Sequence, residues 1–417
     1  MAKTYETYKD SGIAWIGEIP SEWEMGNFRY YGEFTKGKLP STTNVEAKGL
    51  PIIGASEMLG KECRTFTEDK DVPLCGHDDI LILWDGANAG IISSHHTGVV
   101  ASTAVKYCCL NPDINKNYLY HLFKSLEPLF KEKVNGTTIP HMNIKYINEV
   151  PLLIPPINEQ HSIASFLDTK CGEIDALISL QEEMISELQA YKQSVITEAV
   201  TKGLNPHAKM KDSGVEWIGE IPSEWEVCKM KNTIRFINGY AFDSNSFKAE
   251  GIYPVIRIGD IINEKISYDN TVFVNDNTGL ENFQIHDNDI LIAMSGATTG
   301  KIGKVQCNHN GYINQRVGII RCANHSYVYY HFLTDGFIDY VNLSSIGTAQ
   351  PNISSNGILN FAFIKPPLSE QYSIATYLDE KTSQIDSLIS LKQEKIQELK
   401  DYKKSIIYEY VTGKKRV

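Results

Sequence analysis

Apolar residues recur every three or four positions in two long stretches of the chain, which is the pattern of an amphipathic α-helix. The stretches follow Pro155-Pro156 and Pro366-Pro367, and a proline pair favours a helix that begins just behind it. The repeating positions are Ile174, Leu177, Ile178, Ile185, Leu188, Tyr191 and Val195, then Ile385, Leu388, Ile389, Ile396, Leu399, Tyr402 and Ile406. Such a stripe predicts a seam between paired helices, a core-facing helix or a docking face for a partner.

Each long helix is expected to start after a local break. Cys171-Gly172 and Thr382-Ser383 interrupt the stripes, so we expect a break or kink there and long helices over 173–201 and 384–412.

The remaining sequence alternates short apolar runs with turn residues, which is typical of β-strands. The runs that predict strands are Pro51–Ala55, Ile80–Trp84, Val99–Leu110, Val150–Ile154, Tyr253–Ile258, Ile290–Met294, Gly318–Arg321 and Phe361–Ile364. Helical patterns appear at Asn117–Phe130 and Ser326–Asn342. We therefore predict two mixed α/β domains.

The chain contains one unit written twice. Lys9–Glu24 and Lys211–Glu226 agree at 14 of 16 positions, and Pro155–Thr201 and Pro366–Thr412 agree at 27 of 47. The sequence between these blocks diverges but keeps a skeleton, since Gly136-Thr-Thr-Ile-Pro140 matches Gly347-Thr-Ala-Gln-Pro351. Two domains have therefore kept one frame while their surfaces changed.

The repeat sets the expected boundaries. These are an N-terminal segment (1–26), a first globular domain (27–156), a central helical region (157–203), a repeated segment (204–226), a second globular domain (227–363) and a C-terminal helical region (364–417). Two copies of one unit tend to associate about a pseudo-twofold axis, which pairs equivalent helices antiparallel. The predicted fold is α/β, with two mixed α/β domains separated by a rod of two long antiparallel helices. The alternative is two separate domains that each pack their own helix.

Charge and cysteine content change this picture little. The net charge is −11, but residues 27–156 and residues 227–363 each sum to only −1, so the globular stretches could still gather basic side chains on one face. The eight cysteines form no CxxC pair, which favours reduced thiols in a cytoplasmic protein over zinc or disulfides. No apolar run is long enough to cross a membrane.

The repeated motifs resemble the specificity subunit of type I restriction–modification systems. They are KDSGxxWIGEIPSEWE before each domain and PPxxEQxSIAxxLD after it, followed by ID(A/S)LISL and the helix that ends at Val200-Thr-Lys-Gly or Val411-Thr-Gly-Lys. Together with the domains they organise nearly the whole chain.

The resemblance implies that each domain is a target-recognition domain that reads one half of a bipartite site in double-stranded DNA. It implies that the two helices fix the half-site separation and dock two methyltransferase subunits. S-adenosylmethionine would bind those partners. Whether up to two motor–nuclease subunits, which would use ATP and Mg²⁺, also join is left open. No cofactor or metal is expected on this chain.

The chain itself lacks the motifs of catalysis. Asn111-Pro112-Asp113-Ile114 is the nearest match to an amino-methyltransferase NPPF motif, but it lacks the second proline and the aromatic residue. No phosphate loop of the GxxxxGK(S/T) type occurs, and adjacent His95 and His96 would point to opposite faces of a strand. We therefore expect a recognition scaffold that is not an enzyme.

Candidate DNA contacts lie in loops rich in glycine, threonine, asparagine and basic residues. Small residues let the backbone approach phosphates, while Asn, Gln and Arg match base edges. The second-domain candidates are Thr298, Thr299, Lys301, Lys304, Asn314, Gln315, Arg316, Gln350 and Asn352. The first-domain candidates are Lys36, Lys38, Asn88, Ser102, Thr103, Thr137, Thr138, His141 and Asn143. Taken singly, each could equally be a polar surface turn.

The WIGEIPSEW blocks are expected to clamp the chain onto the helices through Trp15, Ile16, Trp23, Trp217, Ile218 and Trp225. The first block would then close a ring with the C-terminal helix. A docking surface for the methyltransferase is the second interpretation.

A second function class stays open at this point. The chain could be a coiled-coil adaptor whose two unlike heads bind proteins and not DNA. Salt-sensitive DNA binding by the purified complex would separate the two classes.

Overall fold

The computed structural model describes residues 4–132, 142, 147, 150–275, 278–306, 310–344 and 351–417. The chain divides into two compact units, unit 1 (1–182 and 393–417) and unit 2 (183–392). The two long helices, α5 (Ile157–Lys202) and α9 (Leu368–Val411), each contribute to both units.

The sequence explains where α5 and α9 begin and end. At each start, a buried glutamine of the PPxxEQ motif donates to the carbonyl of the first proline, Gln160 to Pro155 and Gln371 to Pro366, both at 2.9 Å. At each end, a glycine takes a left-handed conformation that stops the helix, Gly203 at φ +76° and Gly413 at φ +71°.

The expected breaks inside the helices are wrong. Both helices run without interruption through Cys171-Gly172 and Thr382-Ser383. In α5 the buried Cys171 continues the packed face, while a Cβ on Gly172 would meet nothing within 4 Å. A single glycine costs a helix interior only about 1 kcal/mol, which tertiary packing outweighs.

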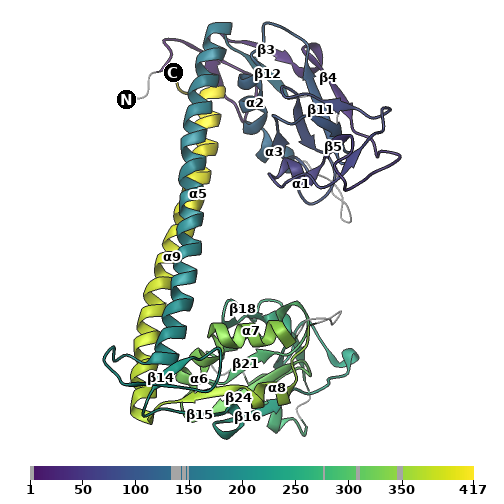
Figure 1. The fold of residues 1–417 in the computed structure, drawn as a ribbon. Coiled ribbons are helices and arrows are strands. Elements are labelled where there is room, and N and C mark those ends of the chain that lie inside the picture. Colours follow the sequence, from purple (N-terminus) through teal and green to yellow (C-terminus); the bar gives the residue numbers. More distant parts are fainter. Residues whose placement is uncertain are drawn as a thin grey trace. The chain divides into compact units, whose positions relative to one another are not determined.

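The two helices lie antiparallel in each unit (Figure 1). In unit 1 Lys403 Nζ, in the C-terminal half of α9, lies 2.6 Å from Asp175, in the N-terminal half of α5. In unit 2 Lys192 Nζ, in the C-terminal half of α5, lies 3.0 Å from Asp386, in the N-terminal half of α9. The repeat offset of 211 relates the two ion pairs, so each unit contains the same helix contact.

Unit 1 adds a mixed α/β domain to its share of the helices. Its elements are β1 (Tyr8–Asp10), β2 (Glu18–Pro20), β3 (Glu24–Asn27), β4 (Gly32–Lys36), β5 (Leu50–Ile53), α1 (Ala55–Met58), β6 (Phe66–Thr67), β7 (Leu74–Cys75), β8 (Ile80–Leu83), β9 (Ile92–Ser93), β10 (Gly98–Val100), β11 (Ala104–Cys109), α2 (Lys116–Ser125), α3 (Glu127–Glu132) and β12 (Pro151–Ile154). The sheets have the strand orders β6-β5-β10-β7, β4-β11-β8-β9, β1-β2 and β12-β3. We call the part from β3 to β12 domain 1.

Unit 2 repeats this plan with a larger sheet. Its elements are β13 (Met210–Asp212), β14 (Glu220–Pro222), β15 (Glu226–Lys229), β16 (Ile234–Asn238), β17 (Tyr253–Ile256), β18 (Ile261–Ile262), β19 (Lys265–Ile266), β20 (Val272–Val274), β21 (Ile290–Ala293), β22 (Ile302–Lys304), β23 (Tyr312–Ile313), β24 (Val317–Cys322), α6 (His325–Phe332), α7 (Asp335–Ser344), α8 (Ser355–Asn360) and β25 (Ala362–Lys365). The sheets have the strand orders β16-β24-β21-β22-β19-β18, β20-β17-β23, β13-β14 and β15-β25. We call the part from β15 to β25 domain 2.

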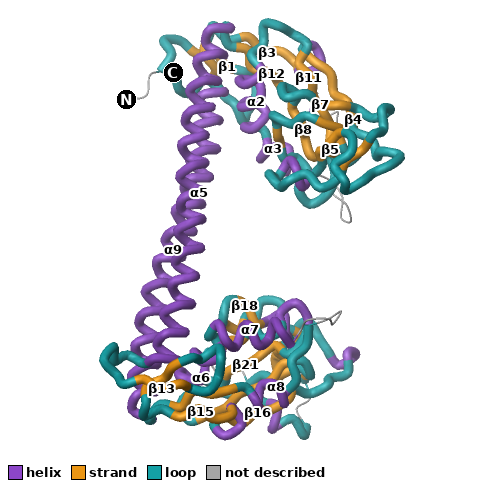
Figure 2. Tube along the Cα trace, in the orientation of Figure 1, coloured by secondary structure: helices purple, strands orange, loops and turns teal. Residues whose placement is uncertain are grey.

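In each domain an interior strand of one sheet is completely buried, β8 in domain 1 and β21 in domain 2; Figure 2 labels both strands. A fully buried tyrosine joins each domain to the helices. Tyr118 Oη donates to Leu153 O of β12 and to Val411 O of α9, and Tyr327 Oη donates to Ile364 O of β25 and to Val200 O of α5. The repeat therefore extends to the contacts that hold each domain on its helix pair.

The prediction of two mixed α/β domains with two long helices is confirmed, with corrections to single elements. Val99–Leu110 is not one strand, because residues 101–103 form a turn between β10 and β11. Each predicted domain helix is two helices, α2 with α3 and α6 with α7. Among the residues that the structure describes, no helix is both long and apolar enough to cross a membrane.

Candidate nucleic-acid interface

Three backbone segments of domain 1 meet beyond the ends of β4, β8 and β10. Gly37 N–H donates to Ala104 O at 3.0 Å, and Trp84 N–H donates to Thr103 O at 2.8 Å. A Cβ on Gly37 would lie 2.1 Å from Ala101 O, so only glycine allows this approach. We call these three segments, which contain Gly37, Trp84 and Ala101-Ser102-Thr103, the loop frame. They carry Lys36, Lys38, Asn88, Ser102 and Thr103, so the fold brings together five residues predicted from the sequence.

Domain 2 builds the same frame from the equivalent segments. Tyr240 N–H donates to Ile313 O at 3.1 Å, and Met294 N–H donates to Arg316 O at 2.9 Å. A Cβ on Gly239 would lie 2.0 Å from Asn314 O, as at Gly37. These contacts align Ala101-Ser102-Thr103 with Asn314-Gln315-Arg316. The backbone is shared, whereas the side chains differ at every position.

A fourth segment joins the frame in domain 2. Asn352 pairs with Ser295 in an isolated antiparallel bridge, and Gly296 N–H donates to Pro351 O at 2.9 Å. Ile353 N–H also donates to Met294 O at 2.9 Å, and in domain 1 Met142 N–H makes the corresponding bond to Trp84 O at 3.0 Å. The candidates Thr137, Thr138, His141, Asn143 and Gln350 lie outside the described residues.

A glycine-bounded loop forms one wall of the frame in both domains. It runs from Gly86 to Gly90 and from Gly296 to Gly300, and all four glycines have positive φ. Asn88 is exposed on the first loop. Thr299 Oγ1 instead donates to the carbonyls of Gly296 and Pro351 at 2.7 and 3.0 Å, which makes it a structural residue of the loop.

Thr298, at the position equivalent to Asn88, also presents no hydroxyl to solvent. Its Oγ1 is buried and has no hydrogen-bond partner among the described residues.

The basic candidates separate into two groups. Lys36, Lys38, Lys301 and Arg316 are exposed around the frame. Lys304 lies at the far end of β22, where it pairs with Ile290, and its Nζ donates to Ser326 Oγ at 3.2 Å. The structure therefore places Lys304 apart from the other candidates.

Two of the basic groups have partners that the sequence reading missed. Arg316 Nη1 donates to Ser295 Oγ at 3.0 Å, and Lys36 Nζ lies 3.6 Å from Asp85. Ser295 and Asp85 occupy equivalent positions before the glycine-bounded loop. At this shared position, the partner of a basic side chain is Asp85 in domain 1, which pairs with Lys36, and Ser295 in domain 2, which accepts from Arg316.

Tyr240 is a further residue that the sequence reading missed. It follows Gly239 as Lys38 follows Gly37, and its side chain is 41% exposed. Its ring centroid lies 4.9 Å from that of Phe242 and 5.2 Å from that of Phe283, so neighbouring aromatic rings fix its orientation. Aligning the two glycines would have revealed this position.

The other candidate Asn, Gln and Thr side chains differ in their exposure to solvent and in their hydrogen bonds to the backbone. Gln315 and Thr103 are exposed. Asn314 is half-buried, and its Oδ1 accepts from Gln315 N–H at 2.6 Å, so its side chain also shapes the turn.

The apolar stripe on the long helices is only partly buried. Ile174, Ile178, Val195, Ile385, Ile396 and Ile406 are buried, and Ile185, Leu188, Ile389 and Leu399 are half-buried. The exposed members are Leu177 (47%), Tyr191 (57%), Leu388 (48%) and Tyr402 (57%), which corrects the expectation that they lie in the seam. With 3.6 residues per turn, Leu177 and Tyr191 point roughly 80° and 120° away from the mean direction of Ile174 and Ile178.

The WIGEIPSEW blocks clamp onto the helices mainly through one tryptophan each. Trp23 and Trp225 are buried and donate from Nε1 to Glu159 and Glu370, in the first turns of α5 and α9. The first block also meets the end of α9, since Tyr408 Oη donates to Trp15 O at 2.7 Å. Trp217 stacks on Phe361 of domain 2 instead, with ring centroids 5.2 Å apart.

The part of the chain that the structure describes contains no group of three or more His, Cys, Asp or Glu residues that could hold a metal ion.

The family model described as "Type I restriction modification DNA specificity domain" matches residues 20–190 and 222–401. The specificity subunit of the type I restriction enzyme MjaVIII from Methanocaldococcus jannaschii is 29% identical over 413 residues, which cover 96% of this chain and 94% of that protein. The EcoKI specificity subunit of Escherichia coli K12 is 27% identical over 212 residues, or 47% of this chain and 44% of that subunit.

The fold resembles that of a solved structure. This structure, described as the structural basis of complex assembly and conformational transition of the type I R-M system, superposes with a TM-score of 0.69. The alignment covers 94% of this chain and 98% of that one at 17% sequence identity.

Proposed function

Because this chain belongs to the family of type I restriction–modification DNA specificity domains, we propose that it is the sequence-reading subunit of such a system. Each of domains 1 and 2 reads one half of a bipartite site in double-stranded DNA. The observation that carries this proposal is that the two domains share the backbone of the loop frame but place different side chains on it. Two domains that bind different half-sites would dock in the same way through the backbone and differ in the side chains that contact bases. An adaptor with two protein-binding heads is not favoured, since the matching family model describes DNA specificity.

The second half-site is read by the more specific set of side chains. Arg316, oriented by Ser295, can donate two bonds to a guanine edge, and the exposed amide of Gln315 suits adenine. Lys301 supplies a phosphate contact at the rim.

Domain 1 presents a different surface on the same frame. Lys36 and Lys38 are exposed cations, while Ser102, Thr103 and Asn88 offer small polar groups to base edges. Asp85 holds Lys36 in place and, as an acceptor, can itself receive a bond from cytosine.

The long helices fix the separation of the half-sites and dock two methyltransferase subunits. Leu177, Leu180 and Tyr402 are exposed in unit 1, and their repeat partners Leu388, Leu391 and Tyr191 are exposed in unit 2. Exposed apolar side chains in equivalent sets suit two copies of one partner, because each copy can make the same contact.

The chemistry resides on those partners. The methyltransferase subunits bind S-adenosylmethionine and methylate adenine, and motor–nuclease subunits, where they join, use ATP and Mg²⁺. This chain contributes position and sequence choice, without a catalytic centre of its own.

Mapping N6-methyladenine in cells with and without this chain tests the proposal. We expect a bipartite methylated motif that disappears when the gene for this chain is deleted and returns when it is restored. A motif that persists in the deletion strain would contradict the proposal, as would methyl transfer by the purified chain without partners.

A further inference from the structure

Each WIGEIPSEW block is joined to a long helix by the same tryptophan–glutamate hydrogen bond. In unit 1 Trp23 Nε1 donates to Glu159 Oε2 at 3.2 Å, and in unit 2 Trp225 Nε1 donates to Glu370 Oε2 at 2.6 Å. Both glutamates belong to a PPxxEQ motif. Each carboxylate keeps a second oxygen, Oε1, that the tryptophan does not use.

In unit 1 a tyrosine takes that second oxygen. Tyr5 Oη donates to Glu159 Oε1, and the Tyr5 ring meets Trp23 edge to face, with centroids 6.0 Å apart. The Arg416 guanidinium lies 5.6 Å from the centroid of the same ring. Burial and the contact with Glu159 raise the pKa of Tyr5, so its hydroxyl stays a proton donor.

In unit 2 the equivalent position holds no tyrosine. The residue at the repeat position of Tyr5 is His207, which is exposed, and its backbone N–H donates to Asn205 Oδ1 at 3.0 Å. Glu370 Oε1 has no hydrogen-bond partner among the described residues, and Glu370 is exposed where Glu159 is half-buried.

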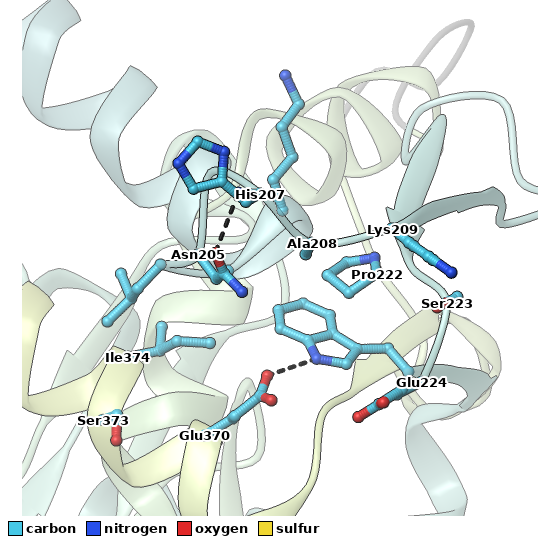
Figure 3. A pocket seen from close by; sticks show the side chains of 14 residues that line it. Asn205, His207, Ala208, Lys209, Pro222, Ser223, Glu224, Glu370, Ser373 and Ile374 are labelled. Carbon is cyan, nitrogen blue, oxygen red and sulfur yellow. Dashed lines mark hydrogen bonds between the residues drawn. The ribbon is translucent and has the colours of Figure 1, made fainter.

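Glu370 lines a cavity of about 430 Å³. Figure 3 shows the Glu370 carboxylate bound to the indole on one side, with Pro222 and Ala208 next to the indole and Asn205 and His207 across the opening. Trp225 itself is only 1% exposed, so the Glu370 oxygen, and not bare indole surface, is the specific feature of the cavity.

We propose that this cavity binds a tyrosine side chain carried by a partner subunit of the restriction–modification complex. The phenol donates to Glu370 Oε1, as Tyr5 does to Glu159 in unit 1, and the residues on either side of the tyrosine fill the rest of the cavity. The partner rests on the proposed function, whereas the tyrosine rests on the copy of the site in unit 1. A second copy of this chain is a poorer source, because its Tyr5 would have to leave its own bond to Glu159.

A graft and a carboxylate variant test the proposal on the full chain with its partner subunits. His207→Tyr supplies the phenol from within, so it should raise the melting temperature of the chain alone and weaken assembly with the partner at least tenfold. Glu370→Gln keeps an acceptor for Trp225 Nε1 but turns the second atom into a donor, so it should weaken assembly without the gain in stability. His207→Ala leaves the cavity open and is the matched control, with assembly as in the wild type.

A photo-crosslinking residue at position 207 identifies the occupant. The expected product joins the chain to a tyrosine-containing peptide of a partner subunit. A crosslink to a peptide without tyrosine, a crosslink to Tyr5 of another copy, or unchanged assembly of the His207→Tyr chain would overturn the proposal. None of these outcomes alters the methylated motif of the wild-type complex, so failure here is distinct from failure of the proposed function.

Discussion

At the scale of single residues, side chains of one chemical type differ in exposure and in hydrogen bonding around the loop frame. Arg316 is exposed and oriented by Ser295, whereas Lys304 is held by Ser326 at the other end of its strand. Thr103 is exposed, whereas the Thr299 hydroxyl donates a hydrogen bond to a loop carbonyl. Exposure and hydrogen bonding within the domain therefore separate the residues available to DNA from residues of the same type that are not, a distinction that the sequence alone does not make.

Arg316→Ala should relax base preference at one position of the second half-site and weaken binding there by about 1–3 kcal/mol, the usual value of a bidentate arginine–guanine contact. The first half-site should stay unchanged. Binding of the purified complex to a panel of single-base variants measures both effects. Lys304→Ala is the matched control, and an equal loss from that variant would mean that the frame is not the interface.

Tyr240→Ala should weaken binding at the second half-site, because an exposed ring fixed by Phe242 and Phe283 can stack on a base or contact a thymine methyl. Tyr240→Phe keeps the ring and should retain most of the affinity. The same binding panel checks this pair. If Tyr240→Phe loses as much as Tyr240→Ala, the hydroxyl and not the ring makes the contact.

At the scale of elements, the sequence predicted the type of most strands and helices but not where they are interrupted. Val99–Leu110 reads as one apolar run, yet Ala101 N–H donates to Ile53 O and a turn forms at 101–103. That turn carries Ser102 and Thr103 into the frame. The opposite error occurred at Gly172, because packing along α5 overrides a local glycine. Propensity is local, while both outcomes depend on contacts distant in sequence.

Gly172→Ala should stabilise the protein by about 0.5–1 kcal/mol, since an alanine loses less entropy in a helix interior and its Cβ would meet nothing within 4 Å. Gly203→Ala should destabilise it, because Gly203 has φ +76° and its Cβ would lie 2.9 Å from the Trp225 ring. Urea unfolding of the two variants measures the difference. Equal effects of the same sign would contradict the helix boundaries described above.

The buried His331 should make unit 2 sensitive to acid. Burial lowers the pKa of His331 to about 3, and its Nε2 accepts from Ile364 N–H at 3.1 Å, so the folded protein keeps the ring neutral. The unfolded chain protonates it near pH 6.5. Above that pH the neutral ring costs the folded state nothing. Below it the free energy of unfolding falls by up to about 1.4 kcal/mol per pH unit.

The variant His331→Gln isolates this contribution, because an amide oxygen can accept the same bond without titrating. Urea unfolding between pH 7 and pH 5 should show a smaller loss of stability in His331→Gln than in the wild type. Parallel curves would mean that His331 does not remain neutral in the folded protein.

At the scale of the whole molecule, the tandem repeat made most of the fold readable from the sequence. The 14 of 16 matches around Trp15 and Trp217 and the 27 of 47 matches along the helices identified the family and the helix pairing. The residues proposed to contact bases were harder to identify, because they are the positions that the two domains do not share. Lys38 and Tyr240 are equivalent because each follows a glycine, Gly37 or Gly239, that makes the same close backbone approach.

Exchanging one domain and sequencing the methylated genome tests the central claim most directly. Residues 27–154 would be replaced by the matching domain of a relative with a different motif, and N6-methyladenine would be mapped in cells that carry the hybrid. The account predicts that one half of the bipartite motif changes while the other half stays the same. A hybrid that assembles and methylates with both halves altered, or with neither altered, would contradict independent reading by the two domains.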